Sequence, residues 1–99
     1  MSEPRIIQIV AKDLKNVRDY IAEDSETYAA KTIKAIYGKF ENLQMFPEIG
    51  SELSKRVSFR TDYKYAVWTD YVIIYKVNSE YVEIYRVMNR YQDITRIFE

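Results

Sequence analysis

The stretch Ile84-Tyr-Arg-Val-Met-Asn-Arg-Tyr-Gln-Asp93 decides how the chain is organised. Apolar and β-branched residues fill its first half, which suits a half-buried strand running from Tyr81 to Met88. Its second half is polar, and Arg86 and Arg90 stand four residues apart. A strand that carries arginines to its own C-terminal end can place an anion-handling site on a rigid support. The stretch therefore predicts both a sheet strand and a candidate site.

Two further strands are predicted upstream of this stretch, at Tyr63 to Trp68 and Tyr71 to Val77. Thr69-Asp70 joins them, and residues 78–80 lead into the last strand; both connections have hairpin length. Apolar or aromatic side chains occur on both faces of this sheet, so we expect both faces to be covered at least in part. Before the strands, the segment Ser51 to Ser58 is predicted to be a loop.

The N-terminal part predicts a strand and then a helix. Residues Arg5 to Val10 are mostly β-branched, which favours a first strand, with Pro4 tolerated at its start. From Ala11 the apolar residues recur three and four apart, which is the spacing of one helical face: Leu14, Val17 and Ile21.

A second, longer helix follows a short link, so the two helices are predicted to form an antiparallel hairpin. Asp24 or Ser25 can cap its start, and Pro47 ends it. Gly38 inside this helix costs up to about 1 kcal/mol relative to alanine, so we expect close packing there. The turn Phe46-Pro-Glu-Ile-Gly50 follows.

These elements predict a single α+β domain over residues 1–99. An N-terminal strand and an antiparallel helical hairpin pack on an antiparallel sheet of about four strands, in the order β-α-α-β-β-β. A short amphipathic tail with Ile94, Ile97 and Phe98 closes the chain.

The composition excludes several kinds of chemistry. Fifteen basic and fifteen acidic residues give a net charge of zero, so nucleic-acid binding would need the charges to be segregated on one face. There is no histidine and no cysteine, which removes the usual neutral-pH acid–base group and the usual zinc ligands. We expect no cofactor and no metal. The apolar runs are too short for a signal peptide or a membrane span, which predicts a soluble, cytoplasmic protein.

Several motifs together resemble the RelE/ParE toxins of bacterial toxin–antitoxin pairs, over essentially the whole chain. The most specific are Asp70-Tyr-Val-Ile-Ile-Tyr-Lys-Val77 and Ile84-Tyr-Arg-Val87, with the polar run that ends at Asp93 and Ile94. The early Ala11-Lys-Asp-Leu14 is similar to the family's first helix. The resemblance implies a toxin held inactive by a cognate antitoxin. It implies one of two targets: ribosome-bound mRNA, cut without a metal in the RelE and YoeB branches, or DNA gyrase, poisoned in the ParE branch.

The chain departs from the nuclease branches of this family at three positions. The closing motif often reads His-Gly-Arg-Arg-Asp, whereas here Asn89 replaces the histidine and Gln92 the second arginine. Val72 stands where RelE-type nucleases carry an arginine. These changes weaken the mRNA-cleavage hypothesis, and Arg86-Val87 is closer to the ParE pattern.

Metal-free RNA cleavage needs a proton acceptor, a proton donor and a cation for the phosphate. On the family pattern the catalytic candidates are Arg90, Tyr91, Arg86 and Arg60. Arg86 and Arg90 share the strand parity of Ile84 and Met88, so they should point to one face if the extended geometry persists. Alternatively, Arg86 is structural and pairs with a carboxylate such as Glu83, Asp93 or Glu99. Arg90 could equally be structural, and Arg60 could be a solvated charge.

Three further cations are candidates for nucleic-acid or target binding: Lys55, Arg56 and Lys64. The alternative is that they only keep the surface and the strand edges soluble. The strand tyrosines could stack on bases, but cross-strand packing or contact with the antitoxin is the more common use.

Two kinds of surface separate the functional hypotheses. A basic concavity that holds Arg60, Arg86 and Arg90 would favour RNA, and a neutral, tyrosine-lined groove would favour a protein target. A third hypothesis is a non-catalytic partner-binding module, or a toxin homologue that has lost its activity.

Overall fold

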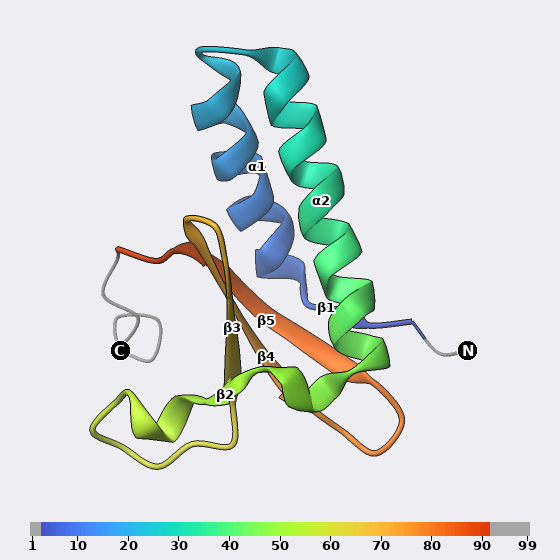
Figure 1. Cartoon of the computed structure of the whole chain (residues 1–99), viewed down its shortest axis with the longest axis vertical. Coiled ribbons are helices and arrows are strands. Elements are labelled where there is room, and N and C mark those ends of the chain that lie inside the picture. Colours follow the sequence, from blue (N-terminus) through green and yellow to red (C-terminus); the bar gives the residue numbers. More distant parts are fainter. Residues whose placement is uncertain (1–2, 92–99) are drawn as a thin grey trace.

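An antiparallel helical hairpin rises above a five-stranded sheet (Figure 1). The fold is known from a computed structural model, which describes residues 3–91. Its elements are β1 (Arg5–Ile6), α1 (Gln8–Ala22), α2 (Glu26–Met45), the 3-10 turn η1 (Pro47–Ile49), β2 (Ser51–Glu52), the 3-10 turn η2 (Leu53–Lys55), β3 (Lys64–Trp68), β4 (Tyr71–Val77) and β5 (Val82–Asn89). The sheet order is β1-β5-β4-β3-β2, with β1 parallel to β5 and the other pairs antiparallel. The predicted α+β architecture is confirmed, with five strands instead of about four. None of the helices described here has the length and apolar character needed to cross a membrane.

The predicted first strand from Arg5 to Val10 is wrong beyond its first two residues. β1 ends at Ile6, and α1 already begins at Gln8. Val10 is fully buried and belongs to the same core cluster as Leu14, so it is the first member of the helical apolar stripe. β-branched residues lower helix propensity only slightly, and burial of that stripe outweighs the preference.

The second helix ends as predicted, but one prediction about its interior is wrong. Ser25 is the cap, and its hydroxyl accepts a hydrogen bond from the backbone N–H of Tyr28 at 3.1 Å. The helix ends at Met45, two residues before Pro47. Close packing at Gly38 is not found, because a Cβ built there has no neighbour within 4 Å.

The segment from Ser51 to Ser58 is more ordered than a loop. It contains the edge strand β2, which pairs Ser51 with Tyr65, and the turn η2. Leu53 in η2 is fully buried. The loop prediction failed because a two-residue strand has too few residues to show a period of two.

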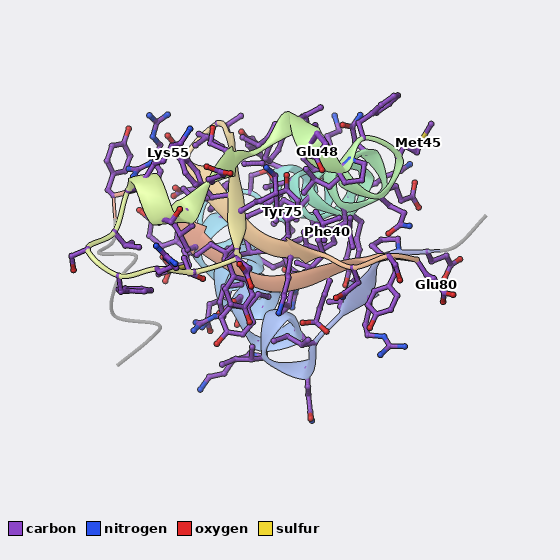
Figure 2. The ribbon with its side chains drawn as sticks, turned by 90° about the horizontal axis from the view of Figure 1, so that it is seen from below. Phe40, Met45, Glu48, Lys55, Tyr75 and Glu80 are labelled. Carbon is purple, nitrogen blue, oxygen red and sulfur yellow. The ribbon has the colours of Figure 1, made fainter. Side chains whose placement is uncertain are left out.

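The core consists of two clusters on the two faces of the sheet, as the residue pattern predicted. One cluster joins both helices to the sheet and includes Phe40 and Tyr75, which lie between α2 and the strands in Figure 2. The other is smaller and gathers buried side chains under η2: Leu53, Val72, Ile74 and Met88. Val72, which replaces the arginine of RelE-type nucleases, is therefore a core residue.

A shift in register divides β5. Ile84 pairs with Tyr75 but Arg86 pairs with Ile74, so Tyr85 is an extra residue in a bulge. As a result Ile84 and Met88 belong to different core clusters. The common face predicted for Arg86 and Arg90 required uninterrupted extended geometry, and the bulge shows that β5 does not have it.

Candidate functional site

A pocket of about 520 Å³ lies between α1 and the C-terminal half of β5. Figure 1 shows α1 rising away from the red end of β5, where the two elements diverge. The pocket is lined from three elements: by Asp13, Asn16, Val17 and Tyr20 of α1, by Tyr71 of β4, and by Arg86, Val87, Met88 and Asn89 of β5. Residues 86–89 of the stretch predicted to carry the site therefore form one wall of this pocket.

An ion pair between Asp13 of α1 and Arg86 of β5 joins two sides of the pocket. Arg86 donates from Nε to Asp13 Oδ2 at 2.8 Å and from Nη2 to Oδ1 at 2.9 Å. The backbone N–H of Val87 also donates to Asp13 Oδ2, at 3.0 Å. These hydrogen bonds raise the pKa of Arg86 above its ordinary value, although burial acts in the opposite direction. The pair is bidentate, and its two charges cancel.

The partner of Arg86 differs from those predicted. Asp13 binds it instead of Glu83, and Asp93 and Glu99 lie outside the described residues. Asp13 occupies two donor atoms of Arg86, which is the kind of carboxylate pairing that the structural alternative requires. Whether it also acts in catalysis stays a prediction.

Tyrosines form the outer part of the pocket. Tyr20 is 76% exposed, and Tyr71 stacks on Trp68 with their ring centroids 6.4 Å apart. Burial raises the pKa of Tyr71, and Asp70, Tyr28 and Tyr20 raise it further through their negative forms. A surface that combines two tyrosines with apolar and amide side chains, and on which Asp13 and Arg86 cancel each other's charge, suits contact with another protein.

The residues after β5 bind the neighbouring turn. The backbone N–H of Arg90 donates to the carbonyl of Asp70 at 2.8 Å, and its Nη1 donates to the carbonyl of Thr69 at 3.3 Å. The Tyr91 N–H donates to Asn89 Oδ1 at 2.9 Å, and the Tyr91 ring is 78% exposed. Arg90 and Tyr91 are not among the residues that line the pocket. Their predicted catalytic roles stay predictions.

The remaining candidates lie near the loop between β2 and β3, outside the pocket. Lys55 pairs with Glu52 at 3.6 Å, and Lys64 pairs with Glu48 at 3.8 Å. Arg56 covers the ring of Tyr65 at 5.2 Å, and Arg60 is exposed. Their roles in target binding are predictions that the geometry leaves untested.

The pocket brings together Arg86 and the tyrosines but neither Arg60 nor Arg90. Within residues 3–91, no group of three metal-binding side chains is found that could hold an ion. The sequence reasoning missed Asp13, although a signal was available. Asp13 lies three residues after Val10 and four before Val17, so it is an acid within the apolar stripe of α1.

Comparison with known families gives one match. The model of the ParE toxin of the type II toxin–antitoxin system parDE matches residues 8–94. The match begins at the first residue of α1 and includes every residue that lines the pocket. No curated relative matches the chain. The match covers well over half of the 99 residues, so the chain belongs to the ParE toxin family of type II toxin–antitoxin systems.

Proposed function

We propose that this toxin arrests growth by binding and poisoning DNA gyrase, and that it does not cut mRNA. The observation that carries the proposal is a pocket without net charge, which exposes Tyr20 and Tyr71 and in which Arg86 is already bound by Asp13. A partner protein can insert a side chain into such a pocket without a charge to neutralise. Membership of the ParE family supports the same target, because the resemblance implies gyrase poisoning for this branch.

For RNA cleavage, the described residues provide two candidate arginines that are already hydrogen-bonded and several tyrosines whose pKa is raised. Two donor atoms of Arg86 bind Asp13, and one nitrogen of the Arg90 guanidinium binds Thr69. A tyrosine can act as a proton acceptor near neutral pH only if its pKa is lowered. Burial instead raises the pKa of Tyr63, Tyr71 and Tyr75. Val72 lies in the core and cannot contact a phosphate.

The chain also has a second protein partner, the cognate antitoxin that toxins of this family possess. We propose that the antitoxin covers the same pocket, so that antitoxin and gyrase exclude each other. The pocket is suited to both, because it is uncharged overall, contains two tyrosines and lies beside the end of β5.

A binding experiment with one pocket tyrosine tests the proposal. Tyr20→Ser removes an exposed ring that lines the pocket, so the fold should be kept while affinity for purified gyrase falls about tenfold or more. Tyr37→Ser is the matched control, since Tyr37 is an exposed tyrosine of α2 that does not line the pocket. Equal affinities of the two variants and the parent chain, measured by calorimetry, would refute the proposed site.

A further inference from the structure

The turn between β3 and β4 contains the one non-glycine residue of the described chain with a positive φ, Thr69 at 51°. The left-handed region is unfavourable for a β-branched side chain, because the Cβ substituents crowd the backbone. Strain of this kind persists only where surrounding contacts hold it, and it is often found where function needs a fixed geometry. The hydrogen bonds that keep this turn in its conformation therefore indicate what the turn is for.

Arg90, the residue after β5, makes one hydrogen bond to Thr69 and one to its neighbour Asp70. Its backbone N–H bonds the carbonyl of Asp70, and its guanidinium bonds the carbonyl of Thr69. Thr69 and Asp70 are the two residues between the paired ends of the strands, Trp68 and Tyr71. Both residues of the turn are thus bound to the same arginine.

The turn determines where one wall of the pocket lies. Tyr71 follows it directly and lines the pocket, while Trp68 precedes it and packs against the main core cluster. The two rings are stacked with 23° between their planes, so they are positioned together. A change of φ at Thr69 would rotate the chain between these two aromatic residues.

We infer that Arg90 is a positioning residue for partner recognition: it holds the strained Thr69–Asp70 turn and thereby keeps Tyr71 on the pocket wall. Its side chain acts through the turn and not on a phosphate. The inference rests on the proposed function in taking the pocket as the gyrase site, but the effect of Arg90 on the turn is independent of any partner.

Trp68 allows the turn to be observed directly, because it is the single tryptophan of the chain. Arg90→Ala should shift Trp68 emission to longer wavelength and make the indole more accessible to acrylamide, since the turn loses one of its two bonds to Arg90. Gyrase affinity should fall by about five- to tenfold, the effect of one hydrogen bond. Arg18→Ala, which removes an exposed arginine of α1 that does not line the pocket, should change neither signal.

A second substitution separates positioning from direct contact. Asparagine enters the left-handed region more readily than threonine, so Thr69→Asn should favour the native turn without help from Arg90. In the Arg90→Ala background, Thr69→Asn should therefore restore the Trp68 emission and most of the gyrase affinity. An arginine that touches the partner or an RNA phosphate would not be rescued in this way.

The results of these experiments distinguish failure of the Arg90 inference from failure of the proposed function. Unchanged Trp68 emission and quenching in Arg90→Ala would overturn the inference, whatever the target is. A changed Trp68 signal without rescue by Thr69→Asn would also overturn it. If Trp68 responds and is rescued while the parent chain shows no affinity for gyrase, the proposed function fails but the role of Arg90 in the turn stands.

Discussion

Asp13 shows how one residue can decide the character of a site. A carboxylate within the apolar stripe of a helix is unfavourable unless it is paired and hydrogen-bonded. Asp13 is 8% exposed and accepts three hydrogen bonds, two from Arg86 and one from the backbone of Val87. It thus joins α1 to β5 and cancels the charge that would otherwise make the pocket basic.

Removing this carboxylate should destabilise the fold. Asp13→Asn leaves Arg86 partly buried without its counter-ion, and loss of one partner of a buried pair costs about 3–5 kcal/mol, so we expect a loss towards the lower end of that range. Urea denaturation measures the effect. Asp19→Asn is the control, because Asp19 is an exposed carboxylate of the same helix, bonded to Lys15 at 2.8 Å. The control should leave stability almost unchanged, because exposed ion pairs contribute little to stability. A similar loss in both variants would contradict the assigned role of Asp13.

At this scale the sequence identified the arginine but not its partner. Arg86 was recognisable because it stands on the last strand beside a polar run. Asp13 lies 73 residues earlier in the chain, and a local pattern carries no information about which distant carboxylate a cation will meet. Tyr20 was missed for a related reason, since an exposed tyrosine on a helix becomes part of a pocket only when a strand lies opposite.

Among the elements, the turn after α2 depends on Tyr75 and Gly50. The Tyr75 hydroxyl donates to the carbonyl of Pro47 at 2.7 Å and accepts from the N–H of Gly50 at 3.0 Å. It thereby ties the predicted Phe46–Gly50 turn to the centre of the sheet. A side chain at Gly50 would collide with this hydroxyl and would lie 2.7 Å from the carbonyl of Tyr65.

The two glycines of the chain should therefore respond in opposite ways to alanine. Gly50→Ala should destabilise by about 1–3 kcal/mol, because the strand and the turn must move apart to admit the methyl group. Gly38→Ala lies in the helix interior with open space around it, so it should stabilise by up to about 1 kcal/mol. Thermal unfolding of both variants gives the comparison. A rise in melting temperature for Gly50→Ala would show that the turn is not packed as described.

Tyr75 also makes a prediction about pH. Burial, partly offset by the bond from Gly50, raises its pKa, so the folded chain keeps the phenol proton at pH values where the unfolded chain loses it. This contribution to the free energy of unfolding is fully present below about pH 10 and is lost as the pH rises further. Tyr75→Phe should lower stability near neutral pH by about 1–3 kcal/mol, because the Gly50 N–H loses its acceptor. It should also make the alkaline loss of stability less steep, as denaturation at several pH values would measure. An unchanged alkaline slope would contradict a buried, neutral Tyr75.

Element types were predictable where the period was long and regular, and boundaries were not. β4 was predicted from Tyr71 to Val77 and has those bounds, since seven mostly apolar residues between turn signals leave little ambiguity. The start of α1 was missed because β-branched residues before Ala11 favour a strand locally while their burial favours a helix. The bulge at Tyr85 could not be read from the sequence, because it arises from pairing with β4.

For the whole molecule, the net charge of zero determines how strongly binding should depend on salt. The chain has a net charge of zero, and the pocket repeats this balance through Asp13 and Arg86. Proteins that bind nucleic acids through 6–10 phosphate contacts lose about 10³–10⁵ in affinity between 50 and 200 mM salt. Binding at this neutral pocket should depend far less on salt.

This prediction can be measured on the purified toxin. Affinity for gyrase should fall by less than about tenfold over the 50–200 mM salt range. Affinity for a single-stranded RNA of generic sequence should be weak at both salt concentrations. Tight RNA binding that disappears steeply with salt would indicate a basic face that the pocket geometry does not contain.

The central claim is that the freed toxin acts on gyrase. The most direct measurement incubates the purified chain with gyrase, ATP and supercoiled plasmid, then denatures the protein and quantifies broken DNA. We expect cleaved plasmid to accumulate with the parent chain and to fall sharply with Tyr20→Ser, while Tyr37→Ser keeps the effect. Intact plasmid, together with new mRNA 5′ ends by primer extension in cells that express the toxin, would contradict the account and assign the chain to mRNA cleavage.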